Sequence, residues 1–234
     1  MNELINTPYI GIFLTLLSFT FGYFLFKQTH FVLFNPLLFS IIIIITFLKL
    51  SHISYESYMV GGSIINILIT PATIALAIKL EENFDYFRQY AHYILSSILI
   101  GIITHSVMIF SLAKAFGFEN KLMASVYAKS ITTAIAVDVT EELNGFIAIT
   151  IISVILTGLT GAIISNFLFK KLNIQHPVAQ GIALGSAAHA MGTSHAIQLG
   201  PVQGAMSSVA LVFTGIIVTL TTPLAQIIIQ WLYS

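Results

Sequence analysis

Charged residues are scarce in this sequence, and cysteine is absent. Only 8% of the 234 residues are charged, 57% are hydrophobic, and the mean hydropathy is +0.95. A soluble domain typically has about 25% charged residues, so this chain has too few polar groups to cover a water-exposed surface. The shortage of charge excludes a soluble enzyme and a disordered protein, and it indicates an integral membrane protein.

Other missing features exclude further classes. Nine Lys and Arg balance nine Asp and Glu, so no basic excess is present to contact nucleic-acid phosphates. The lack of cysteine removes disulfides, thiolate nucleophiles and cysteine-based metal sites. No G-x-S-x-G, H-E-x-x-H or P-loop pattern occurs. We therefore predict a protein that is not an enzyme and that has no cofactor, no metal and no nucleic-acid partner.

What the sequence does have is a succession of long apolar runs. A transmembrane helix needs about 20 mostly apolar residues, and these runs are continuous rather than alternating as in a β-barrel. The eight runs lie at about 9–26, 31–48, 58–80, 93–116, 122–137, 146–169, 178–199 and 205–232. They predict an all-α polytopic membrane protein of about eight hydrophobic segments. We expect a single integral membrane domain over 1–234, placed in the cell membrane as a multi-pass protein.

Three of these segments carry features that interrupt a membrane helix. The fifth segment is short and has Lys129 in its middle, and the seventh carries several glycines. We expect these two segments to be broken or re-entrant and to meet near the bilayer midplane. In the third segment a helix break is predicted at Asn66, Pro71 and Thr73. Short similar stretches also suggest an inverted repeat, at 71–77, 130–136 and 192–196.

Lys129 is the sharpest candidate for a functional residue. An ammonium group at the centre of a membrane helix costs about 2.5–3.5 kcal/mol on insertion scales, so such a residue usually faces a cavity or a partner. Hydroxyl side chains follow it at Ser130, Thr132 and Thr133. A cation beside hydroxyl donors is suited to binding a small organic anion. The alternative is that the span starts late and that Lys129 extends to the membrane interface.

A second candidate cluster lies at 185–195 and is rich in small and polar side chains. A histidine in an apolar segment is costly without a partner and titrates near neutral pH. The cluster supplies the remaining predicted substrate-binding residues, which are Ser186, His189, Gly192, Thr193 and Ser194. The alternative is that His189 is a packed core histidine. His189 and His195 are six residues apart, which does not fit the i, i+4 spacing of a zinc pair.

Two acidic or titratable residues are candidates for ion or proton coupling. These are His189 and Asp138, the latter at the end of the fifth segment. For Asp138 a solvated helix end is an equally good interpretation. His105 lies within the fourth segment, and we expect it to be a packed core residue.

The two clusters resemble the LrgB/CidB family. The resemblance rests on 129–133 and 177–193, extends to 71–77 and 204–208, and so covers nearly the whole chain. Members of that family were first named as holin-like or antiholin-like effectors of murein hydrolase activity. Plastid relatives are glycolate/glycerate translocators, and bacterial relatives are associated with pyruvate uptake. This sequence departs from the family pattern at Ala128 and Ala134, where prolines often stand.

The resemblance implies two functions. The first is a secondary transporter of small monocarboxylates, of the pyruvate, lactate, glycolate and glycerate class, coupled to an ion or a proton. The alternative is a holin-like or antiholin-like membrane regulator of murein hydrolase activity and autolysis, with no transport cycle. The implied partners are the lipid bilayer, a small organic anion and a small holin-like membrane protein. We also expect a homo-oligomer, namely a dimer.

Overall fold

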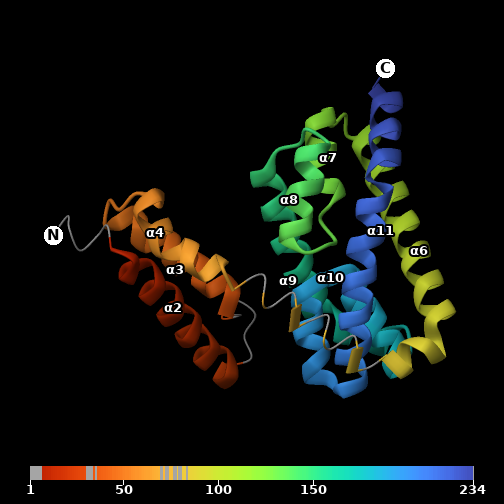
Figure 1. Ribbon diagram of the computed structural model, residues 1–234, viewed down its shortest axis with the longest axis horizontal. Coiled ribbons are helices and arrows are strands. Elements are labelled where there is room, and N and C mark those ends of the chain that lie inside the picture. The colour runs from red at the N-terminus through yellow and green to blue at the C-terminus, as the bar shows by residue number, and fades with distance from the viewer. Residues whose placement is uncertain are drawn as a thin grey trace. The chain divides into compact units, whose positions relative to one another are not determined.

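The described part of the chain is entirely helical. The computed structural model describes residues 7–29, 34, 36–68, 71, 74–75, 78, 81–82 and 84–233. Among these residues no strand occurs, so the all-α prediction is confirmed. The helices are α2 (Pro8–Thr29), α3 (Pro36–Leu50), α4 (Tyr55–Asn66), α6 (Phe84–Ala115), α7 (Asn120–Tyr127), α8 (Thr133–Glu142), α9 (Ile147–Lys171), α10 (Pro177–Leu199) and α11 (Pro201–Tyr233) (Figure 1).

Four of the described helices are long and apolar enough to cross a membrane. They cover Pro8–Thr29, Phe87–Ala115, Ile147–Lys171 and Pro201–Leu232. The chain is therefore a multi-pass membrane protein. The count of eight hydrophobic segments stays a prediction, because α3 has 15 residues, α7 has 8 and α8 has 10.

The chain divides into two compact units, Met1–Ala75 and Leu76–Ser234. In the first unit α2 packs against α3 and α4. The contact with α4 is close because a Cβ on Gly61 would lie 2.9 Å from the Cα of Gly11. The Thr15 and Tyr58 hydroxyl oxygens lie 2.8 Å apart across the same contact. Small residues and a hydroxyl pair thus hold the contact between α2 and α4.

In the second unit the long helices α6, α9 and α11 surround two shorter pieces of structure. Ile94 and Ile98 of α6 are fully buried against Met206 and Val209 of α11. The rings of Phe87 and Phe213 stack between the same helices, with centroids 5.0 Å apart. Of the remaining elements, α7 and α8 together form one helical hairpin, and α10 alone forms a second.

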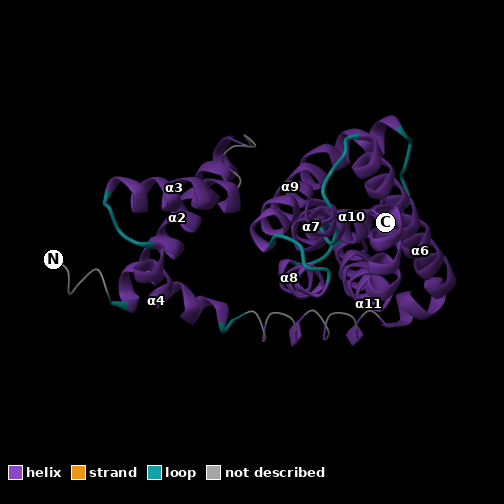
Figure 2. Cartoon of the chain, turned by 90° about the horizontal axis from the view of Figure 1, so that it is seen from above, coloured by secondary structure: helices purple, strands orange, loops and turns teal. Residues whose placement is uncertain are grey.

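The first is the α7–α8 hairpin, in which residues 128–132 separate two short helices. Its open end is closed by hydrogen bonds across a wide sequence separation. Phe146 donates its backbone N–H to the Ser125 Oγ at 2.6 Å, and Thr150 donates its hydroxyl to the Ser125 carbonyl at 2.8 Å. Figure 2 shows α7 and α8 lying next to each other. The chain therefore enters the unit, turns at 128–132 and returns.

The second is the α10 hairpin, in which α10 folds back on itself at His189. This residue has φ 41° and ψ −132°, so the helix is interrupted there. Leu184 and Ala196 belong to one buried cluster, although in a straight helix they would lie about 18 Å apart. A Cβ on Gly192 would collide with the Leu184 carbonyl oxygen. In Figure 1 the α7–α8 hairpin occupies the upper part of the second unit and α10 the lower part.

Candidate functional site

The tip of the α7–α8 hairpin and the first half of the α10 hairpin contribute to one cavity of about 760 Å³. Residues 127–131 of the α7–α8 hairpin line it, as do Ser186 and Ala187, which precede the tip of the α10 hairpin. Helices α6, α9 and α11 complete the wall. The polar lining residues are Thr104, His105, Tyr127, Lys129, Ser130, Thr157, Thr160, Ser186 and Thr214. The cavity thus combines a mostly apolar wall with hydroxyl groups and one ammonium group.

Lys129 occupies the break between α7 and α8 and is half-buried. Its backbone N–H donates to the Val126 carbonyl at 3.3 Å, a turn bond that ends the α7 helix. Among the described residues that line the cavity, none is Asp or Glu. A half-buried cation with no carboxylate beside it in the cavity wall favours an anionic ligand, because the ligand would supply the missing countercharge.

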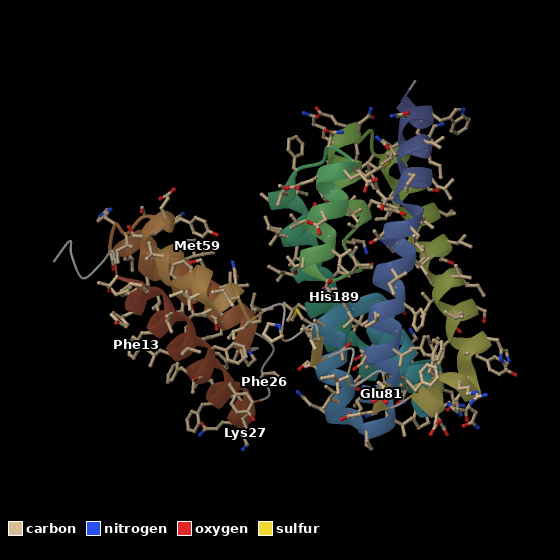
Figure 3. The ribbon with its side chains drawn as sticks, in the orientation of Figure 1. Phe13, Phe26, Lys27, Met59, Glu81 and His189 are labelled. Atoms are coloured by element: carbon tan, nitrogen blue, oxygen red, sulfur yellow. The ribbon has the colours of Figure 1, made fainter. Side chains whose placement is uncertain are left out.

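His189 lies at mid-height in the second unit (Figure 3) and forms the tip of the α10 hairpin. It is 4% exposed, and its Nε2 donates to the Val154 carbonyl of α9 at 2.9 Å. The ring packs so closely on α9 that a Cβ on Gly158 would lie 2.6 Å from the His189 Cε1. His189 does not belong to the cavity lining. In this geometry the side chain anchors the hairpin tip to α9.

The structure distributes the predicted residues of the first cluster unequally. Lys129 and Ser130 line the cavity. Thr132 is the N-cap residue of α8, and Thr133 is its exposed first residue. Asp138 lies further along α8 with an exposed side chain, outside the cavity lining.

The predicted residues of the second cluster are divided by the fold-back. Ser186 lines the cavity, whereas Gly192 and Thr193 are buried in the returning half of α10. Thr193 donates its hydroxyl to the His189 carbonyl at 2.9 Å and also lies 2.9 Å from the Ser207 hydroxyl of α11. Ser194 is exposed. Thr193 therefore bonds to the hairpin tip and attaches the returning half of α10 to α11.

The predicted helix break in the third segment belongs to the first unit. Helix α4 ends at Asn66, and Pro71 is exposed. Thr73 lies outside the described residues.

Sequence reasoning missed two polar groups in the cavity wall. The Nε2 of His105 and the Oγ1 of Thr214 are buried and have no hydrogen-bond partner among the described residues. A buried polar atom without a partner costs about 1–3 kcal/mol, so both are candidates for ligand contacts. The sequence favoured a packed histidine at 105, and it held no signal for Thr214, which is one of several threonines in a long apolar run.

Comparison with known proteins identifies the family. The model of the LrgB-like family matches residues 15–228. The chain belongs to the LrgB-like family. Its curated relatives include the antiholin-like protein LrgB of Bacillus cereus (strain B4264) and of Bacillus anthracis (strain A0248). Each is 36% identical over 219 residues, which covers 93% of this chain and 95% of the relative.

The match confirms the resemblance seen in the two sequence clusters. The LrgB-like family region includes both hairpins and every residue of the cavity wall, since it runs from 15 to 228. Comparison with solved structures found no match for the chain. The name antiholin-like belongs to the relatives.

Proposed function

We propose that this LrgB-like chain is an antiholin-like protein of the cell membrane that restrains murein hydrolase activity. The observation that carries this proposal is the 36% identity to antiholin-like relatives over 93% of the chain. The proposal includes no catalytic step. It does include a small holin-like membrane protein and a second copy of this chain as partners.

The proposal is tested in a bacterium that lacks its own LrgB-like protein. Expression of the chain, alone or with a small holin-like protein, is expected to lower murein hydrolase activity and to slow detergent-induced lysis. Vector without insert is the control. Unchanged lysis under both conditions would contradict the regulator.

The cavity favours a second candidate function, the transport of a small organic anion. A carboxylate that leaves water loses its hydration, and an unpaired ion in an apolar site is expensive. Lys129 offers a charge and hydrogen-bond donors in a cavity that holds no acidic side chain among its described lining residues. Charge-assisted hydrogen bonds contribute about 1.5–3 kcal/mol each. The ligand class that fits is a small monocarboxylate.

The two hairpins support this candidate. Carriers often place substrate sites where interrupted helices meet near the bilayer midplane, and irregular backbone is tolerated in a membrane where it lines a cavity. We propose that the α7–α8 hairpin and the α10 hairpin are re-entrant segments that enter from opposite membrane faces. Coupling to an ion or proton is assigned to His189 or Asp138, and an inward proton gradient is then expected to accelerate uptake.

Uptake into proteoliposomes tests the second candidate. Labelled pyruvate, lactate, glycolate and glycerate are offered to the purified chain, and saturable uptake of at least one is expected. The lysis assay repeated with Lys129→Met separates the two functions. If the Lys129→Met protein still restrains lysis, the regulator needs no anion site. If the variant loses both the restraint of lysis and anion uptake, the two functions depend on the same site.

A further inference from the structure

A second cavity of about 440 Å³ lies between α6 and α10, towards the beginning of both helices. Its polar lining residues are Tyr90, Tyr93, Ser97, His176 and Ser186. The rings of Tyr90 and His176 meet edge to face with centroids 6.3 Å apart. No lysine, arginine or carboxylate is among its described lining residues. It therefore offers hydrogen-bond donors without a fixed charge.

Ser186 lines both cavities. Its hydroxyl donates to the Ile182 carbonyl of the preceding helical turn at 2.8 Å, so the side chain is held against its own helix. A serine is small, and nothing larger on α10 is shared by the two cavities. Ser186 is thus the lining residue that the two cavities share.

Helix α6 lines both cavities with one continuous face. Tyr90, Tyr93 and Ser97 line the second cavity, and Gly101 and His105 line the cavity of Lys129. Spacings of three and four residues place side chains on the same side of a helix. At 1.5 Å per residue, the stretch from Tyr90 to His105 is about 22 Å long. A Cβ on Gly101 would meet no atom within 4 Å, so no side chain covers this face of α6 at Gly101.

We propose that the second cavity is the outer chamber of a path by which a small organic anion reaches Lys129, and that Ser186 is the junction. The proposal rests on the transport candidate above. Passage requires sites that bind well enough to admit a ligand and weakly enough to release it. Phenol, imidazole and hydroxyl donors without a fixed charge meet that need, and the charge of Lys129 lets the cavity that contains it bind the anion more tightly.

The absence of cysteine makes the path directly testable, because any introduced thiol is the only one in the chain. Ala183 lines the second cavity alone, and Ala187 lines the cavity of Lys129 alone. The variants Ala183→Cys and Ala187→Cys are reconstituted in proteoliposomes and treated with a sulfonate-bearing methanethiosulfonate, an anionic probe. A hydrated thiolate attacks the reagent sulfur, a mixed disulfide forms, and methanesulfinate leaves. Ile103→Cys, at an exposed position that lines neither cavity, is the matched control.

Both alanine-derived thiols are expected to react. The Ile103→Cys thiol is not, because an exposed side chain on this membrane-spanning helix would face lipid, where no hydrated thiolate forms. Adding Ser186→Leu is expected to slow modification of Ala187→Cys by roughly tenfold or more while that of Ala183→Cys stays unchanged, because a thiolate reacts only where the reagent arrives. Ser186→Ala keeps the junction small and is expected to leave both rates unchanged. An Ala187→Cys rate that Ser186→Leu does not alter would overturn the proposal.

Two further arms separate folding and function. Unchanged reactivity of Ala183→Cys shows that Ser186→Leu has folded, and if that variant fails, Ala183→Leu narrows the outer chamber alone and is expected to slow Ala187→Cys in the same way. Unlabelled glycolate is expected to protect Ala187→Cys. Slowing by Ser186→Leu without protection by glycolate would retain the path and contradict a monocarboxylate as its ligand.

Discussion

The two hairpins of the second unit reach the same cavity by different means. The α7–α8 hairpin turns over residues 128–132 with ordinary backbone angles, and its tip is polar, with Lys129 and Ser130 in the cavity wall. The α10 hairpin turns at a single residue, His189, with φ 41°, and its halves pack through small residues. The comparison shows that the first hairpin places a charged side chain in the cavity wall, whereas the second is defined by close packing of its two halves. Charge changes should therefore affect the first, and volume changes the second.

The largest expected effect concerns the charge at the α7–α8 tip. Lys129→Met keeps most of the stem and loses the ammonium group, so anion binding is expected to weaken by at least about tenfold, since 1.4 kcal/mol is a factor of ten. Saturable glycolate uptake into proteoliposomes is then lost, and Lys129→Arg retains part of it because the charge stays but the donor geometry changes. Parent-like uptake by a well-folded Lys129→Met protein would show that this lysine merely extends to the interface.

The next effect concerns volume beside the α10 tip. Gly158→Ala adds a Cβ that would lie 2.6 Å from the His189 ring, so the free energy of unfolding is expected to fall by about 1–3 kcal/mol. Thermal unfolding of the protein in detergent measures the change. Gly101→Ala is the matched control: its added Cβ meets nothing within 4 Å, and a glycine in a helix interior is about 0.5–1 kcal/mol worse than alanine. Equal melting temperatures for the two variants would contradict the close packing.

A smaller effect separates the two contributions of His189. His189→Ala loses the hydrogen bond to Val154 and keeps a side chain at positive φ, whereas His189→Gly loses the bond but tolerates the backbone angle. We expect the free energy of unfolding of the glycine variant to be the higher by about 1 kcal/mol, so that it unfolds at the higher temperature. If the alanine variant is the more stable, the fold-back does not depend on the angle at this residue.

Much of this architecture follows from the sequence, and the reasons are specific. The apolar runs predicted helices because only a helix satisfies its own backbone in lipid, and Lys129 marked the position where the fifth run is divided between α7 and α8. The fold-back at His189 had no equivalent signal, since positive φ usually selects glycine. Helix α6 begins at Phe84 rather than near residue 93, because its first turns carry polar side chains that an apolar window excludes.

The candidate site was predictable only in part. Lys129, Ser130 and Ser186 line the cavity, whereas Thr132, Thr133 and the residues beyond the α10 tip do not. The difference arises because neighbours in sequence are separated once the chain turns. The walls contributed by α6, α9 and α11 come from apolar runs in which a lone threonine or histidine has no distinguishing spacing.

The smallest expected effect concerns Thr214 of α11, in the cavity wall. Thr214→Val removes a buried hydroxyl that has no partner among the described residues, so stability is expected to stay equal or to rise by up to about 1 kcal/mol. Thr222→Val, on the same helix, removes a buried hydroxyl that donates to the Val218 carbonyl at 3.0 Å, and is expected to lower stability by about the same amount. Thermal unfolding of both variants measures the change in stability. An equal loss of stability in the two variants would show that the Thr214 hydroxyl is hydrogen-bonded.

The solitary charge in the cavity wall has an electrical consequence. With a monovalent anion beside the protonated Lys129, the described lining residues and the ligand together carry no net charge. Without the anion they carry one positive charge. One elementary charge that crosses the full membrane field corresponds to about 2.3 kcal/mol per 100 mV. A carrier built on this cavity that moves no coupling ion would therefore move its loaded site without sensing the membrane voltage, and the voltage would act on the return of the empty site.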